Sequence, residues 1–446
     1  MLNHSTRTIH TGGKLVVLFM SVGLALGCGG AQKKTGSDGE PPLPPGPAIG
    51  QGATNRKPKR DIPKEALDDY KEALAYFQQQ DPSGWSKSTC SSAAEKFAQV
   101  ASKHSKLVEA RYMAGLSYHR CAMSDQAEKE YQRALEVDRA HALSMSNLGE
   151  IYFQAGKVDL ARKYWESALK ADGKIVAARN NLAWLILEDL RKNTPGSTQW
   201  KKLEKQARDE LSRALAVNTD NVKTYVLYAL VYIEGWENNR SRLDLAKTLL
   251  DEGAKRDDKF APLHNARGLV QMKRNNQGDA LASFRKAVEL DPNFVEARMN
   301  VGHITLAFRK YDTAEEQFTK VLELQPKNYE ATVGLGAAQR GLNKLDAAEA
   351  SYKKAIELDS NRGTAYFNLG VLYKDFRANS SNDVKASQQS FKQAREYFNT
   401  FLSKSDASKD DKEEAKQNIS DCDKIIKQLD DVIKAMAQDP SAGGGK

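Results

Sequence analysis

Residues 108–141 read VEARYMAGLSYHRCAMSDQAEKEYQRALEVDRAH, and the same 34-residue pattern recurs without gaps at 142–175, 261–294, 295–328 and 329–362. Each copy has glycine at its eighth position, alanine at its twentieth and an aromatic residue at its twenty-fourth. Self-similarity at a fixed period of this length indicates a stacked repeat architecture. The sequence therefore predicts a series of short structural units stacked one on the next.

Each unit is expected to contain two antiparallel helices. Small side chains at the eighth and twentieth positions let two helix backbones approach closely, as Gly149 and Ala161 do in the second copy. The aromatic residue, here Trp165, is expected to fill the hollow between one helix pair and the next. The predicted fold class is therefore all-α.

The unit resembles the tetratricopeptide repeat. Leu148-Gly149, Tyr152, Ala161, Trp165 and Ala168 occupy the positions that this motif requires. The resemblance implies an α-solenoid, and the same signature continues elsewhere with insertions at the turn inside the pair, for example around Thr194-Pro195-Gly196-Ser197. We expect nine repeats within residues 61–406, at about 62–107, 108–141, 142–175, 176–221, 222–260, 261–294, 295–328, 329–362 and 363–406.

A solenoid of this kind needs a cap because its terminal repeat has one unprotected apolar face. Residues 407–437 carry apolar side chains at helical spacing, namely Ile419, Cys422, Ile425, Ile426, Leu429, Ile433 and Met436. We predict a C-terminal capping helix in which Cys422 is buried. The alternative is a separate helix that binds a partner, and residues 438–446 are expected to form a disordered tail.

The N-terminus indicates export. Residues 1–27 have two basic residues before an apolar run that is too short to span a bilayer but typical of a secretory signal. Gly27-Cys28 after this run resembles the lipobox of bacterial lipoproteins, although Ala25 stands where that pattern usually has Leu. The resemblance implies lipidation of Cys28, such as by palmitate, and plain secretion is the alternative. Gly29 in place of Asp favours the outer membrane, facing the periplasm, over retention at the inner membrane.

Residues 28–60 are expected to form a disordered tether. They hold seven Gly and six Pro with almost no large apolar side chains, so they cannot bury enough surface to fold. The tether and the leader also carry most of the net charge of +9. Its basic residues could contact anionic lipid headgroups. No basic stripe interleaved with aromatic residues indicates nucleic-acid binding.

Two of the cysteines could form a disulfide. Cys90 is expected before the second helix of the first repeat, and Cys121 at the end of the first helix of the second repeat. These turns lie at the same edge of neighbouring repeats, so an oxidising compartment would permit a bridge. The alternative is two unpaired small hydrophobic residues.

The sequence gives no sign of catalysis. Its seven histidines are scattered, with no pair at metal-ligand spacing and no HExxH helix. Nucleophile elbows, phosphate loops and dinucleotide fingerprints are also missing. We therefore expect no enzyme activity, catalytic residue, metal, cofactor or small-molecule substrate.

Function in such a solenoid is expected on the concave face, which the first helix of each repeat lines. The candidate groove has an apolar middle and amide side chains able to hold a peptide backbone, and it suits an apolar segment or amphipathic helix of a partner. The alternative is that curvature buries these side chains against neighbouring repeats. The candidate residues are Tyr112, Leu116, Asn147, Phe153, Asn180, Asn181, Trp184, Leu187, Val226, Leu230, Ile233, Asn265, Leu269, Met272, Asn300, His303 and Asn368.

Taken together, the leader, tether and repeat array are similar to the tetratricopeptide lipoproteins of myxobacterial gliding motility. That resemblance implies a non-enzymatic scaffold in a multiprotein envelope complex, with protein partners in the periplasm and outer membrane. Two alternatives remain: a pilotin-like assembly factor for an outer-membrane secretin or another secretion or pilus system, and a regulator of peptidoglycan enzymes. The carboxylate clamp of chaperone-binding members, with Lys at the fifth and Asn at the ninth position, is missing.

Overall fold

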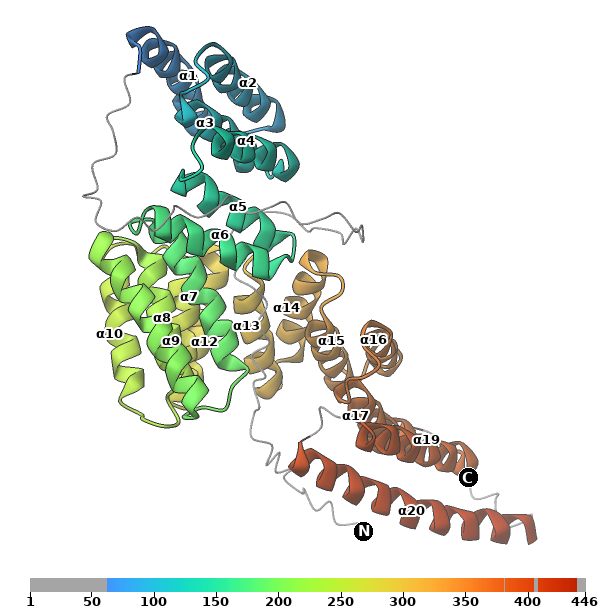
Figure 1. The fold of residues 1–446 in the computed structure, drawn as a ribbon. Helices are drawn as coiled ribbons and strands as arrows, with labels where there is room; N and C mark the ends of the chain where they lie inside the picture. The colour runs from blue at the N-terminus through green and yellow to red at the C-terminus, as the bar shows by residue number, and fades with distance from the viewer. Residues whose placement is uncertain (1–61, 381, 405–407, 439–446) are drawn as a thin grey trace. The chain divides into compact units, whose positions relative to one another are not determined.

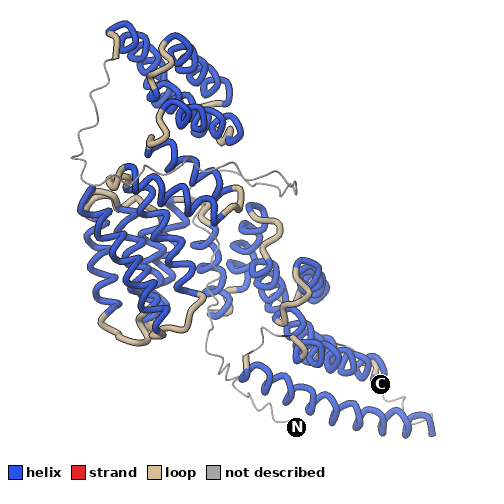
Figure 2. Tube along the Cα trace, in the orientation of Figure 1, coloured by secondary structure: helices blue, strands red, loops and turns tan. Residues whose placement is uncertain are grey.

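The computed structural model describes residues 62–380, 382–404 and 408–438. The predicted signal peptide, the lipidation site Cys28, the tether and the C-terminal tail lie outside these residues. Helices joined by short turns make up the described part, which contains no strand (Figures 1 and 2). The predicted all-α repeat fold is thus confirmed. None of the described helices is long and apolar enough to cross a membrane.

The chain divides into two compact units, with the boundary between Thr194 and Pro195. The boundary falls in the turn where the sequence pattern shows an insertion, inside the expected repeat 176–221. The helices of the first unit are α1 (Lys64–Ser83), α2 (Lys87–Lys103), α3 (Val108–Arg120), α4 (Ser124–Val137), α5 (Ala142–Gln154), α6 (Val158–Ala171) and α7 (Val176–Arg191).

The second unit continues the pattern and ends in a long helix. Its helices are α8 (Thr198–Val217), α9 (Val222–Glu234), α10 (Arg242–Ala254), α11 (Ala261–Lys273), α12 (Gln277–Leu290), α13 (Val295–Ala307), α14 (Tyr311–Leu324), α15 (Tyr329–Gly341), α16 (Leu345–Leu358), α17 (Thr364–Val371), a π-helix η1 (Leu372–Arg377), α18 (Ala378–Ser380), α19 (Val384–Leu402) and α20 (Lys409–Gln438). In both units, helices adjacent in sequence pack as antiparallel pairs (Figure 1).

The glycine at the eighth position of a repeat lets the aromatic ring of the same repeat lie on the helix backbone. A Cβ atom added to Gly149 would lie 2.5 Å from Trp165 Nε1, and one added to Gly115 would lie 2.6 Å from Tyr131 Cε1. The ring also reaches the next helix pair, because Phe318 contacts both Gly302 of its own repeat and Gly334 of the following one. The aromatic residue is expected from the sequence to pack between one helix pair and the next. It also packs on the glycine of its own pair.

The turn inside the pair requires a left-handed backbone at one repeated position. The fifteenth residue of each 34-residue copy has a positive φ, at Ala122, Gly156, Asn275, Arg309 and Asn343. Glycine, and to a lesser degree asparagine, adopts this conformation at low cost. Ala122 and Arg309 adopt it without that advantage, so the fold holds them there.

An aspartate ends the second helix in four of the five gapless repeats. Asp138, Asp172, Asp291 and Asp359 each accept a hydrogen bond on Oδ1 from the backbone amide two residues later, at 2.9–3.0 Å. This is the Asx turn, which competes with continuation of a helix. In these four repeats it favours the end of the second helix at one position, and α14 ends at the equivalent position with Gln325 in place of the aspartate.

The predicted C-terminal cap is α20, which packs against α19. Its apolar face buries Ala415, Cys422 and Ile426 in a cluster with Phe398 and Phe401 of α19. Cys422 is fully buried and carries a free thiol, as expected. Figure 1 shows α20 running beside α19 at the C-terminal end of the described chain.

Candidate functional site: the inner helices of the repeats

The first helices of successive repeats lie next to one another in each unit. α5 contacts α7 in the first unit, and α9 contacts α11 and α13 contacts α15 in the second. These contacts join helices that are one full repeat apart. They form the inner side of the stack, where the sequence analysis places the candidate groove.

The apolar middle of that groove is not an open surface, and this corrects the sequence prediction. The exposed fraction is 8% for Trp184, 6% for Leu230 and zero for Leu187. The physical reason is that first helices of successive repeats converge on the inner side, so their large apolar side chains pack together. The candidate residues that are buried are Asn180, Trp184, Leu187, Val226, Leu230, Ile233 and Leu269.

The remaining candidates keep part of their surface exposed and form the accessible inner face. In the first unit they are Tyr112, Leu116, Asn147, Phe153 and Asn181. In the second unit they are Asn265, Met272, Asn300, His303 and Asn368. This set is more polar than the predicted groove, because the large aliphatic side chains are the ones that became buried.

The amide side chains already have partners within the protein. Asn147 Nδ2 donates to the Tyr131 hydroxyl at 2.9 Å, and Asn300 Nδ2 donates to Asn265 Oδ1 at 2.9 Å. Asn368 Nδ2 donates to the backbone carbonyl of Thr364 at 2.9 Å. The sequence analysis assigned these amides to a bound peptide. Their donor groups instead join repeats or bond to their own helix.

The candidate His303 and the equivalent His119 of an earlier repeat pack against the repeat aromatics. The His303 ring meets Phe318 edge to face with centroids 5.2 Å apart, and His119 lies in the same way on Tyr131 at 6.1 Å. Burial lowers the pKa of His303, against the opposing charge of Glu330. Burial likewise lowers the pKa of His119, opposed by Glu150. Both rings are therefore held in surroundings that favour the neutral form.

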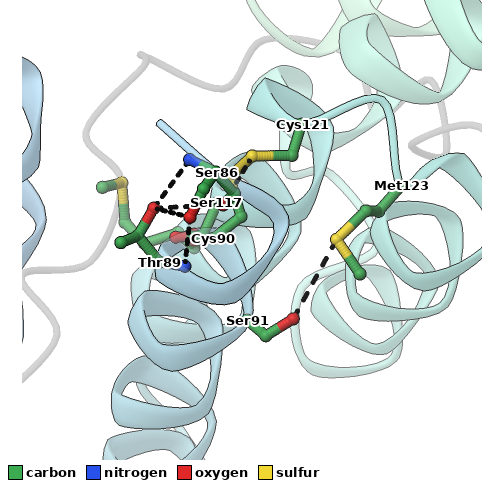
Figure 3. Close-up of a disulfide and its surroundings, with 8 residues drawn as sticks. Ser86, Thr89, Cys90, Ser91, Ser117, Cys121 and Met123 are labelled. Atoms are coloured by element: carbon green, nitrogen blue, oxygen red, sulfur yellow. Dashed lines mark hydrogen bonds between the residues drawn. A yellow bond between two sulfur atoms is a disulfide. The ribbon is translucent and has the colours of Figure 1, made fainter. Parts of the chain in front are cut away.

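The disulfide joins the first and second repeats. Cys90 and Cys121 are bonded, with Cα atoms 6.3 Å apart (Figure 3). Cys121 Sγ also lies 3.1 Å from the Ser86 carbonyl oxygen. Because a bridged sulfur has no proton, this is a contact and not a hydrogen bond. Ser86 itself caps α2 through a reciprocal arrangement with Thr89, which fixes the start of the helix that carries Cys90.

A cluster of potential metal ligands escaped the sequence analysis. Glu65 and Asp69 lie one turn apart on α1, and His104 at the end of α2 joins them. His104 Nε2 lies 3.0 Å from Asp69 Oδ2, and Lys103 Nζ donates to the same oxygen at 3.3 Å. The spacing of 35 residues between Asp69 and His104 carries no local signal, so only the helix pairing reveals the cluster. The ammonium of Lys103 at this oxygen opposes a bound cation.

An arginine–aromatic cluster in the second unit also escaped the sequence analysis. The Arg242 guanidinium lies 5.5 Å from the Trp200 ring centroid and 5.8 Å from that of Tyr232. It also donates to Glu204 Oε1 at 2.7 Å, while Tyr228 stacks on Tyr232. These contacts join α8, α9 and α10 in the repeats with inserted turns.

Comparison with known proteins supports the repeat assignment. One family model described as tetratricopeptide repeat matches residues 124–174, 147–191 and 302–363, and a second such model matches 261–294. One curated relative, the human protein O-mannosyl-transferase TMTC1, is 27% identical over 201 residues. That match covers 45% of this chain but only 21% of TMTC1. The transferase activity in its name therefore does not pass to this chain by the match.

Solved structures that match part of the chain include a tetratricopeptide protein from Thermus thermophilus, TTC0263, at 23% identity and a TM-score of 0.39. The match covers 45% of this chain and 99% of that one. Human IFIT1 matches at 19% identity and a TM-score of 0.49, covering 74% of this chain and 80% of its own. YrrB, described as a tetratricopeptide protein with an unusual peptide-binding site, matches at 19% identity and a TM-score of 0.25, covering 53% of this chain and 95% of its own. The matched segments 124–191, 261–294 and 302–363 of this chain are therefore tetratricopeptide repeats.

Proposed function

We propose that the protein is a non-enzymatic interaction scaffold that holds protein partners on the accessible inner face of its repeats. The observation that carries this proposal is the run of tetratricopeptide repeats, which are typical of protein–protein interaction. The partly exposed Tyr112, Phe153 and Met272 offer apolar contact area on that face, with Asn181 and His303 beside them. Aromatic and methionine side chains are the kind enriched at protein interfaces.

We further propose that a lipid on Cys28 anchors the chain at the outer membrane, facing the periplasm, as part of an envelope complex of gliding motility. Support comes from the lipobox-like Gly27-Cys28 after an apolar leader. The Cys90–Cys121 bridge agrees with folding in an oxidising compartment. A pilotin-like assembly factor and a regulator of peptidoglycan enzymes are the competing proposals for an exported repeat protein of this build.

Crosslinking in cells tests the scaffold proposal. Photoreactive residues at Asn181 on α7 and Met272 on α11 should capture specific proteins, since both side chains are partly exposed on the inner helices. Matched controls at Val158 on α6 and Leu245 on α10 are 40% and 49% exposed on second helices and should capture none of them. Capture at the control positions alone would place binding on the outer side and refute the inner-face proposal. The captured proteins would decide among the three roles. Stoichiometric envelope components would support the motility scaffold, a substoichiometric secretin would support the assembly factor, and peptidoglycan enzymes would support the regulator.

Cell fractionation tests the anchor. The Cys28→Ser variant should lose acyl labelling and move from the membrane fraction to the soluble periplasmic fraction. The reason is that two or three acyl chains on Cys28 would supply the membrane affinity. If the variant still sediments with the outer membrane, the anchor proposal is wrong. The scaffold proposal does not depend on that outcome.

A further inference from the structure

The repeat aromatic at the twenty-fourth position has a polar partner in the first unit. The Tyr131 hydroxyl accepts from Asn147 Nδ2 of the next repeat at 2.9 Å. His119, the twelfth residue of its repeat, places Nδ1 3.4 Å from the same hydroxyl. Trp165, the equivalent residue one repeat later, donates Nε1 to the Ser146 carbonyl at 3.0 Å. The polar atom of the buried ring is therefore satisfied in both repeats.

In repeat 329–362 the equivalent residues do not form these hydrogen bonds. Tyr352 replaces Tyr131, Arg340 replaces His119, and Asn368 of the next repeat replaces Asn147. Asn368 Nδ2 donates to Thr364 O of its own helix, so it does not serve the tyrosine. Among the described residues, neither the Tyr352 hydroxyl nor Nη1 of Arg340 has a hydrogen-bond partner, although both atoms are buried.

The two groups belong to one site on the inner side of α15 and α16. The ring of the fully buried Tyr352 lies on Gly336, where an added Cβ would stand 2.7 Å from its Cε1. Arg340 follows Gly336 by one turn on the same face of α15. Burial raises the pKa of Tyr352 to about 12, and the charge of Arg340 opposes that shift, which places the guanidinium within electrostatic range of the ring.

The Arg340 guanidinium makes an aromatic contact and forms no ion pair with an acid among the described residues. Its guanidinium lies 5.7 Å from the ring centroid of Phe376, which the π-helix η1 presents. Single π-turns within helices are frequent at functional sites. A buried cation normally has an acidic partner, and a buried hydroxyl normally has an acceptor. Here two buried donors, one of them charged, have no hydrogen-bond acceptor, and the nearby acid Asp375 forms no ion pair with Arg340.

We propose that Arg340 and Tyr352 bind one side-chain carboxylate, from an Asp or Glu of a protein partner, which enters when the partly exposed Arg340 side chain turns outward. This inference rests on the proposed scaffold function and deepens it by naming the partner chemistry at one site. A carboxylate oxygen accepts from both donors and neutralises the guanidinium, which a neutral carbonyl cannot do. The fifth and ninth positions of this repeat, Val333 and Ala337, are apolar. The site thus has donors for a single carboxylate and lacks the further donors that a free C-terminus would need.

Asp375 on η1 is the residue that opposes such a ligand. Burial raises the pKa of Asp375, while Lys374 and Arg340 both lower it. Its carboxyl is therefore close enough to Arg340 to interact with it. Lys374 is already engaged, donating to Asn418 Oδ1 at 2.6 Å. Removing the Asp375 charge should accordingly strengthen carboxylate binding.

The test uses N-acetyl-glutamate amide as the probe and N-acetyl-glutamine amide as its neutral twin. The full chain, labelled with ¹³C at the Cζ atoms of arginine and tyrosine, is titrated with each compound and followed by NMR. Signals of Arg340 and Tyr352 are assigned from the Arg340→Lys and Tyr352→Phe variants. The expected result is a saturable shift of both signals with the glutamate compound and none with the glutamine compound.

The variants give the quantitative predictions. Tyr352→Phe keeps the ring on Gly336 but should weaken binding roughly tenfold, as expected for loss of a hydrogen bond to a charged group. Asp375→Asn should strengthen it, and Tyr131→Phe, at the satisfied equivalent, should leave it unchanged. Equal shifts with both compounds, no shift of either signal, or binding insensitive to Tyr352→Phe would each overturn the proposal. Carboxylate binding without inner-face crosslinks would refute the scaffold proposal alone, and crosslinks without carboxylate binding would refute this site alone.

Discussion

At the residue scale, the contact between the eighth-position glycine and the repeat aromatic sets how closely two helices pack. Gly149→Leu should destabilise the protein by roughly 1–3 kcal/mol, because even its Cβ would lie 2.5 Å from Trp165 Nε1. The same change would disturb the bond from that nitrogen to Ser146. Urea unfolding followed by circular dichroism measures the effect. Gly278→Leu is the matched control, since nothing lies within 4 Å of an added Cβ there.

The left-handed fifteenth position allows a second test. Arg309 has φ of 56° and Gly156 has φ of 77°. Arg309→Gly should stabilise the fold by about 1 kcal/mol, and Gly156→Ala should destabilise it by a similar amount, because a Cβ is strained in this conformation. An added Cβ at Gly156 meets no atom within 4 Å, so the cost there comes from the backbone alone. Thermal midpoints that move in the same direction for both variants would contradict this explanation.

His303 should make stability fall in mild acid. Burial lowers its pKa in the folded state, so the unfolded chain binds the proton at higher pH. The stabilising contribution is complete above the ordinary histidine pKa of about 6.5 and is lost as pH falls below it toward the folded value. His303→Gln should therefore show a smaller drop in urea midpoint between about pH 7.5 and 5.5 than the parent chain. An unchanged drop would mean that other groups cause the pH dependence.

At the scale of elements, helix α20 covers the apolar face that α19 would otherwise expose. Ile426 and Cys422 of α20 pack with Phe398 and Phe401 of α19. A chain ending at Lys404 should lose helicity beyond that of α20 itself and bind a hydrophobic dye, because a terminal repeat without its cap exposes its core. Circular dichroism and dye fluorescence measure both effects. A chain ending at Gln438 retains α20 and is the control. If the chain ending at Lys404 has the same helicity per residue as this control, α20 is not the cap.

The helix pattern was predictable from the sequence for a simple reason. Contacts such as Gly115 with Tyr131 join residues that recur at constant spacing, so five copies of the repeat reveal them. The π-helix η1 and the unit boundary after Thr194 belong to the repeats with insertions. There the spacing changes, and periodicity cannot predict how the backbone accommodates the extra residues.

At the scale of the whole molecule, the cysteines report the compartment in which the chain folds. Among the three cysteines of the described residues, denatured but unreduced protein from cells should alkylate at Cys422 alone, and reduction should add Cys90 and Cys121, because the latter two are bonded. Mass spectrometry of alkylated peptides measures this. The bridge closes a separation of 31 residues, so its loss should cost about 4 kcal/mol on the chain-entropy model. Full alkylation before reduction would contradict folding in an oxidising compartment.

The sequence by itself determined the repeat unit, the pairing of its helices, the buried position of Cys422 and the nearness of Cys90 to Cys121. Only the tertiary structure decided which inner-face residues stay accessible, burying Trp184 and Leu230 and engaging Asn147 with Tyr131. It alone shows Arg340 and Tyr352 as buried donors without acceptors. The physical reason is that repeat spacing encodes contacts within a helix pair, whereas exposure on the inner side depends on the angle at which each pair meets the next.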